Sequence, residues 1–169
     1  MVTSSILSPS DCDAQALADF ENLVIEAGTV DPQSLTERIR DASQLLFLRE
    51  SDGRLVGVGA LKRPRLGYRS KVFAKAGTTV PPDAYRIELG WIAVAKSHQG
   101  RGLWRRIIGR LISLAGNEHL FATTRADARA MRFAADYGFK PAGKAYSSGR
   151  GYDLVLYLRK VERKHSRDQ

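Results

Sequence analysis

Three stretches of the chain repeat apolar residues at the spacing of an α-helix. The first helix is predicted from a cap at Ser10 or Asp11 to about Ala27, and the second begins at Asp31-Pro32. The third covers residues 103–115, where an apolar stripe faces a row of arginines. The apolar positions of the first two segments are Ala16, Leu17, Phe20, Leu23, Val24, Ala27, Leu35 and Ile39.

Shorter runs of β-forming residues lie between and after these helices. Residues 44–50 and 54–61 flank the turn Ser51-Asp52-Gly53, which predicts a hairpin. Residues 85–94 are mostly apolar, which is typical of a strand buried on both faces. The remaining predicted elements are strands at 120–124, 142–146 and 152–159 and a helix at about 127–137. This order predicts a mixed α/β sheet.

The segment 63–84 shows no clear period and is predicted to be a long connection. Connections of this length in a compact domain are more often functional than idle. A second interpretation is an amphipathic lid with Leu66, Val72 and Phe73 turned inward.

Composition limits the organisation of the chain. Its 169 residues are 43% hydrophobic, which suits one compact domain, predicted over 1–159, followed by a polar basic tail at 160–169. No apolar run approaches the roughly 18 residues of a membrane span, and the N-terminus lacks the order of a signal peptide, so we expect a cytoplasmic protein without membrane contact. The single Cys12 forms no internal disulfide, and the histidines are scattered, so no metal site is expected. Whether the chain forms a homodimer is left open.

The net charge of +9 is unevenly distributed along the chain. Residues 1–61 hold ten acids against four bases, whereas residues 62–75 hold six bases, residues 96–110 hold five, and neither of these two stretches contains an acid. A concentrated positive field suits an anionic ligand such as a nucleotide phosphate, an acidic substrate or RNA. The alternative is an ordinary solvated basic surface.

The sequence Gln99-Gly100-Arg101-Gly102 joins the apolar strand at 85–94 to the helix at 103–115. Such a loop presents backbone N–H groups at the positive end of a helix, and glycine lets a phosphate approach them closely. A tight strand-to-helix turn also recruits glycine, so the motif alone leaves both interpretations open. A P-loop would need Gly-Lys-Ser/Thr, and a dinucleotide fingerprint would need a third glycine near Arg105; both are absent.

Val94 followed by Gln99-Gly100-Arg101-Gly102 is similar to the signature Gln/Arg-x-x-Gly-x-Gly/Ala of the GNAT superfamily of acetyl-CoA-dependent N-acetyltransferases. The resemblance covers about residues 45–159, in the order IELGWIAV, LWRRIIGRLISLA, FATTR, ADARAMRFAADY and a Gly-Phe turn at 138–139. It implies a mixed, mostly antiparallel sheet that is splayed at its centre and flanked by helices. It also implies acetyl transfer from acetyl-CoA to a primary amine by direct attack in a ternary complex.

The resemblance further implies where acetyl-CoA binds. Its pantetheine arm would pair with the strand ending at Val94, and its pyrophosphate would meet the loop amides, aided by charge from Arg101, Arg105 and Arg106. The implied cofactor-binding residues are Ile92, Ala93, Val94, Gln99, Gly100, Arg101, Gly102, Leu103 and Trp104. Three positions depart from the family pattern: Trp104 replaces a small residue, Ala128 replaces a common asparagine, and Ala134 replaces a tyrosine that acts as the acid.

Glu88 is the candidate general base because it lies eleven residues before Gln99, as in histone-type members of the superfamily. Burial on an apolar strand would suit this carboxylate to accept a proton near neutral pH. The alternative is a structural ion pair with Arg86 or with a base of the 62–75 segment. The backbone N–H of Ile92 is the candidate oxyanion donor, and Tyr146 or Ser147 is a candidate acid.

The acceptor cannot be named from the sequence. The basic 62–75 segment lies where the family builds its acceptor site, so Lys62, Tyr68 and Lys71 are predicted to bind the substrate, most simply a small-molecule amine. A different class of function, a non-catalytic acyl-CoA-binding or RNA-associated module, is permitted by the basic charge and the missing tyrosine. No stacking motif supports nucleic acid.

Overall fold

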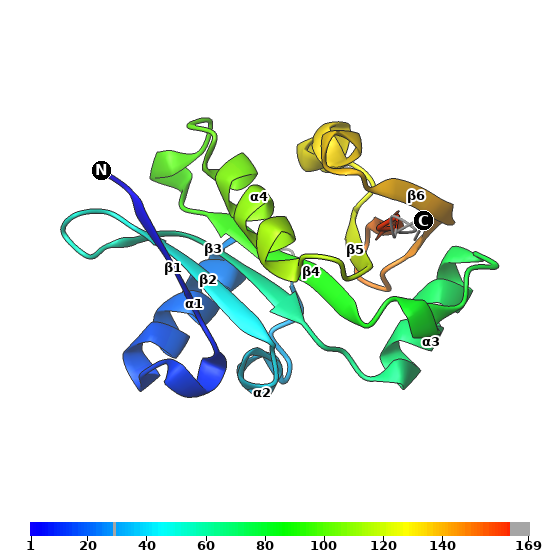
Figure 1. The fold of residues 1–169 in the computed structure, drawn as a ribbon, viewed down its shortest axis with the longest axis horizontal. Helices are drawn as coiled ribbons and strands as arrows, with labels where there is room; N and C mark the ends of the chain where they lie inside the picture. Colours follow the sequence, from blue (N-terminus) through cyan, green and yellow to red (C-terminus); the bar gives the residue numbers. More distant parts are fainter. Residues whose placement is uncertain (29, 163–169) are drawn as a thin grey trace, which may run out of the picture. The chain divides into compact units, whose positions relative to one another are not determined.

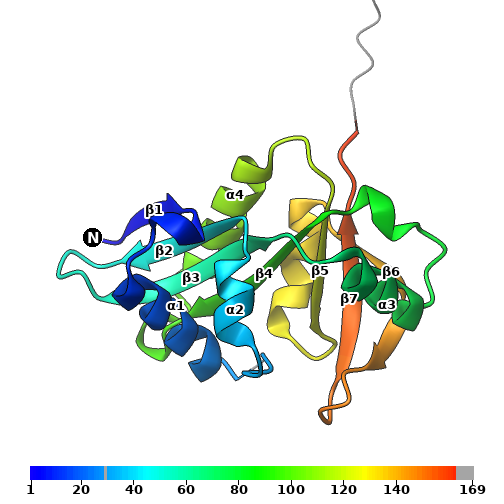
Figure 2. The same cartoon turned by 90° about the horizontal axis from the view of Figure 1, so that it is seen from below.

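A computed structural model describes residues 1–28 and 30–162, and these divide into two compact units (Figures 1 and 2). The first unit consists of Met1–Pro64 and Glu88–Leu114, and the second of Arg65–Ile87 and the described residues from Ala115 onward. The described residues hold seven strands, paired mostly antiparallel and flanked by helices. The expected mixed, mostly antiparallel α/β class is confirmed.

The first unit is built on four antiparallel strands in the order β1 (Thr3–Leu7), β2 (Gln44–Arg49), β3 (Leu55–Lys62) and β4 (Ile87–Val94). The helices α1 (Ala14–Glu26) and α2 (Leu35–Arg40) cover one face, and α4 (Leu103–Ala115) covers the other (Figure 1). Because both faces are covered, the central strands read as nearly continuous apolar runs.

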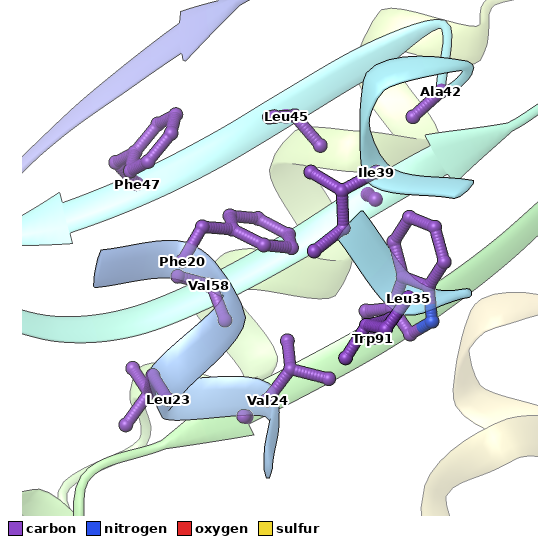
Figure 3. Packing of buried hydrophobic residues seen from close by; sticks show 12 residues of the cluster. Phe20, Leu23, Val24, Leu35, Ile39, Ala42, Leu45, Phe47, Val58 and Trp91 are labelled. Carbon is purple, nitrogen blue, oxygen red and sulfur yellow. The ribbon is translucent and has the colours of Figure 1, made fainter. Parts of the chain in front are cut away.

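Successive residues of β2 and β3 point to opposite faces of the sheet. Leu45 and Phe47 join the core under α1 and α2, where the Phe20 and Phe47 rings meet edge to face at 5.6 Å (Figure 3). On the opposite face Gly59 lies under α4, and a Cβ there would come within 2.5 Å of Ile107 and 2.9 Å of Leu111. The missing side chain therefore allows α4 to approach β3 closely.

The second unit pairs β5 (Leu120–Arg125), β7 (Asp153–Arg159) and β6 (Lys140–Ser147) antiparallel, in that order. The helix α3 (Leu66–Ala76) packs on them, with Phe73 edge to face against Phe121 at 5.7 Å. Its last turn lies so close to Gly143 that a Cβ there would be 1.9 Å from the Ala76 carbonyl oxygen. The helix predicted at about 127–137 is present as η4 (Arg129–Tyr137), which is a 3-10 helix.

The predicted N-terminal helix is present, but its start was misplaced. Pro9–Asp11 forms a separate 3-10 turn, and the cap of α1 is Asp13, whose carboxylate accepts a hydrogen bond from the Ala16 N–H. The break between the turn and α1 lies at Cys12 and Asp13, which both have extended backbone angles. The strand β1 was not predicted, because the polar Thr-Ser-Ser sequence gives no strand signal at a sheet edge.

The long connection predicted at 63–84 is wrong, because residues 66–76 of it form α3. Val72 and Phe73 are buried, as the amphipathic interpretation expected, whereas Leu66 is 49% exposed. The strand expected from Tyr85 begins at Ile87, after a 3-10 turn at Pro82–Ala84.

The prediction of a single domain over 1–159 stays a prediction, and residues 163–169 of the expected tail lie outside the described residues. Among the helices that are described, none combines the length and apolarity that a membrane crossing requires.

Candidate active site

The glycine loop lies between the end of β4 and the start of α4. A 3-10 turn at Lys96–His98 follows the strand, and α4 begins at Leu103. Gly100 and Gly102 have φ angles of 77° and 75°, in the region that favours glycine, and no described atom lies within 4 Å of a Cβ built on either. The backbone of the loop is therefore open on one side, at the positive end of a 13-residue helix. This geometry suits an incoming phosphate.

On its other side the loop is anchored through His98, which is only 3% exposed. The Nε2 atom of His98 lies 2.9 Å from Glu50 Oε1, and Nδ1 lies 2.8 Å from Ser97 Oγ. A hydrogen bond from Arg54, and a second from His98, lower the pKa of Glu50 to about 2. Sequence reasoning missed this pair, because nothing in the sequence links two residues that lie 48 positions apart.

The strand β4 contains a bulge just before the residues expected to hold the pantetheine arm. Val58 pairs with Ala93, but Ala60 pairs with Gly90, so β4 carries one extra residue opposite Gly59. Trp91 takes a φ of 50°, which is uncommon for a residue other than glycine. Its ring is buried against Phe20, at a centroid distance of 6.3 Å. The stabilisation from this packing offsets the cost of the strained backbone.

Glu88, the candidate base, is 3% exposed and forms an ion pair with Lys62, whose Nζ lies 2.9 Å from Glu88 Oε1. The two residues face each other across β3 and β4. The Lys62 side chain passes over Gly90, where a Cβ would come within 3.0 Å of Nζ, and reaches a point 4.6 Å from the centre of the Trp91 ring. The ion pair raised as the alternative for Glu88 is therefore present, with Lys62 rather than Arg86 as its partner.

The remaining residues predicted to bind acetyl-CoA lie in the same unit. Arg101 and Arg105 are exposed, whereas the Arg106 guanidinium donates a hydrogen bond to the Val2 carbonyl at 2.8 Å. The Gln99 amide donates to the Val94 carbonyl at 3.2 Å, which closes the turn between strand and loop. Leu103 is buried and Trp104 is half-buried.

The other predicted site residues belong to the second unit. Tyr68 and Lys71 lie on α3, both exposed. Tyr146 lies on β6 and is half-buried against the cluster that contains Phe73. The buried Arg69, which sequence reasoning did not single out, donates hydrogen bonds to the carbonyls of Pro82 and Tyr85 and so fixes α3 to the segment before β4.

Comparison with known proteins gives a consistent result for the fold. An acyl-CoA N-acyltransferase from Pseudomonas aeruginosa superposes with a TM-score of 0.69 at 14% identity, covering 94% of this chain and 99% of that one. ElaA from Escherichia coli gives 0.68 at 13% identity, with 95% and 100% covered. The ribosomal-protein-S18-alanine N-acetyltransferase from Escherichia coli gives 0.67 at 15% identity, with 99% of both chains covered.

No curated protein matches the sequence itself. The model of the acetyltransferase (GNAT) family, however, matches residues 15–139, which include the whole of β4, the glycine loop and α4. The family uses acetyl-CoA as its acyl donor. The chain belongs to the GNAT family and is an N-acetyltransferase.

Proposed function

We propose that this acetyltransferase moves the acetyl group of acetyl-CoA directly to a primary amine of a small molecule, within a ternary complex. The observation that carries the proposal is the glycine loop at the N-terminus of α4, where no described atom lies within 4 Å of a Cβ built on Gly100 or Gly102. The residues from Gln99 to Trp104 would hold the pyrophosphate, and the exposed Arg101 and Arg105 would add positive charge beside it.

Glu88 is the proposed base for the incoming amine. A protonated amine cannot attack a carbonyl carbon, so a carboxylate that accepts its proton speeds the reaction. The ion pair with Lys62 keeps the carboxylate of Glu88 in one orientation, and an acceptor ammonium would compete with Lys62 for it. Direct attack requires no enzyme nucleophile.

The backbone N–H of Ile92 is the proposed donor to the oxyanion of the tetrahedral intermediate. Ile92 lies at the bulge of β4, opposite Gly59, where an extra residue interrupts the regular pairing with β3. A backbone donor at such a bulge is fixed before the reaction and costs no reorganisation. Tyr146 is the proposed acid for the leaving thiolate, and water is the alternative source of this proton.

The acceptor is identified only as an amine. Tyr68 and Lys71 are exposed on α3, and we take them as support for an acceptor that carries a carboxylate or a phosphate. Lys62, the third residue predicted to bind the acceptor, forms an ion pair with Glu88. The ribosomal-protein-S18-alanine N-acetyltransferase, by its name, acts on a protein. Small amines and a peptide N-terminus therefore belong in the same test panel.

The test combines turnover with binding. Release of free thiol from acetyl-CoA is measured over amines with and without acidic groups, and transfer is expected for at least one of them. Acetyl-CoA should also raise the melting temperature, because it binds the folded state. Gly102→Glu should abolish this shift by placing a negative side chain where the pyrophosphate lies, and an unchanged shift would remove the loop from the proposal.

A further inference from the structure

His98 is held rigidly at the entrance to the glycine loop. A carboxylate only accepts hydrogen bonds, so the 2.9 Å contact with Glu50 Oε1 requires that Nε2 of His98 carries a hydrogen. The other ring nitrogen contacts the Ser97 hydroxyl at 2.8 Å. With both nitrogens engaged and 3% of the residue exposed, the ring has one position.

Glu50 is held equally firmly, at the end of the β2–β3 hairpin. Its Oε1 contacts His98, and its Oε2 separately accepts hydrogen bonds from Nε and Nη2 of Arg54. Backbone hydrogen bonds close the same turn, from the Glu50 N–H to the Arg54 carbonyl and from the Gly53 N–H to the Glu50 carbonyl, both at 2.9 Å. The carboxylate therefore links the hairpin to the residue before Gln99.

Backbone hydrogen bonds reinforce this link as far as Gln99, whose N–H donates to the Lys96 carbonyl at 3.5 Å. The Ala95 N–H donates to the Val56 carbonyl at 2.9 Å, and the His98 N–H donates to the Ala95 carbonyl at 2.8 Å. Gly100 and Gly102 lie just beyond Gln99, and glycine loses more conformational freedom on ordering than any other residue. A loop of this composition binds an anion well only if its ends are fixed beforehand.

We infer that the Glu50–His98 pair positions the glycine loop for the pyrophosphate of acetyl-CoA, so that it sets donor affinity and not the rate of acetyl transfer. The inference rests on the proposed function of the loop. Neither side chain needs to touch the cofactor; both are positioning residues. Loss of either side chain leaves the start of the glycine loop unfixed. The free energy needed to order the loop then reduces the binding free energy of CoA.

The experiment measures the dissociation constant of CoA by calorimetry for Glu50→Ala, His98→Ala and the double variant. A hydrogen bond to a charged group corresponds to roughly a tenfold or larger change in an equilibrium constant, so each single variant should raise the Kd about tenfold. The double variant should be no weaker than either single one, because both remove the same contact. Glu50→Gln retains an acceptor oxygen for Nε2–H and should bind closer to wild type.

Arg54→Ala is the matched control. It removes the hairpin's other contact with the Glu50 carboxylate but leaves His98 in place, so the Kd for CoA should stay within about twofold of wild type. With saturating acetyl-CoA, kcat should be unchanged in all of these variants while KM follows Kd. If His98→Ala does not fold, as its melting curve would show, the comparison of Glu50→Ala with Arg54→Ala decides the question.

Two results would overturn the inference. The first is a Kd for CoA in Glu50→Ala equal to that of wild type. The second is a Kd that rises as much in Arg54→Ala as in Glu50→Ala, which would mean general damage to the hairpin. The Gly102→Glu variant separates this failure from that of the proposed function. If Gly102→Glu abolishes CoA binding while Glu50→Ala does not, the loop assignment stands and only the positioning role is lost.

Discussion

Glu88 and Lys62 show how one pair of residues can serve structure, catalysis or both. Breaking a buried ion pair from one side leaves an uncompensated charge, which is strongly destabilising by itself. A single substitution at Glu88 therefore mixes a loss of stability with any loss of chemistry. The two effects separate only when the partner charge is removed as well.

We expect Glu88→Gln to lower kcat by roughly 10²-fold near pH 7, the usual contribution of a positioned base. Part of the loss should be recovered at higher pH, because the amine then sheds its proton without help. Glu88→Gln leaves Lys62 without its carboxylate partner, so the melting temperature should also fall. The measurements are pH–rate profiles and melting curves on the same samples.

The double variant Glu88→Gln/Lys62→Gln provides the control. Without the unpaired ammonium, the melting temperature should return toward that of wild type while kcat stays low. If activity returned together with stability, Glu88 would be a structural residue and the base would have to be sought elsewhere.

Cys12 allows a second prediction at this scale, because it is the single thiol of the chain. Burial, followed by the nearby carboxylates of Asp11 and Asp13, raises the pKa of its thiol. A raised pKa lowers the thiolate fraction at pH 8, so alkylation by iodoacetamide should be slower in the native protein than in urea, and the native rate should still increase above pH 9. Equal native and denatured rates at pH 8 would contradict this account.

At the scale of elements, the sequence predicted those whose apolar pattern is regular. The bounds of α4 were predicted correctly because one apolar stripe runs along its whole length. The hairpin of β2 and β3 was also found, since a polar turn with glycine separates two apolar runs. The helix α3 was missed because Gly67 and several bases interrupt its pattern, so few of its residues carry the signal of burial.

Within the candidate site, the local features that the sequence predicted are those that depend on residues close together in the chain. The glycine loop and its position before α4 followed from spacing alone. The bulge at Trp91 could not be predicted, because it arises from the pairing of β4 with β3, and the sequence of β4 reads as an ordinary strand. The link from His98 to Glu50 requires the same pairing.

The packing of α4 on β3 depends on Gly59, which gives a prediction at this scale. Gly59→Ala forces a Cβ against Ile107 and Leu111, and overpacking of this kind typically costs about 1–3 kcal/mol of unfolding free energy. Chemical denaturation measures it. Gly109→Ala is the matched control: it lies in α4 with no described atom near the added Cβ, and should stabilise by up to about 1 kcal/mol. Equal effects of the two substitutions would refute the close approach at Gly59.

At the scale of the whole molecule, charge is sorted along the sequence in a way that the fold does not require. The acids concentrate in residues 1–61, whereas residues 62–75 and 96–110 carry bases alone. Surface charge of one sign contributes little to stability but attracts ligands of the opposite sign over about a Debye length. The second of these stretches contains the glycine loop and the first turns of α4, so one of the two basic stretches lies where the proposed function needs an anion.

The salt dependence of the reaction tests this arrangement. Raising the ionic strength shortens the Debye length from about 10 Å at 0.1 M to about 3 Å at 1 M, so KM for acetyl-CoA should rise several-fold over that range while kcat changes little. Substituting Lys96, Arg101 and Arg105 together by glutamine should flatten this dependence, because these exposed bases supply the attraction. Substituting Arg38 and Arg40, which lie outside both basic stretches, should leave it as in wild type. Two results would contradict this account: a KM that does not respond to salt, or the same salt response in both sets of variants. Either would show that the basic stretch is an ordinary solvated surface and that the loop binds its phosphates through the backbone alone.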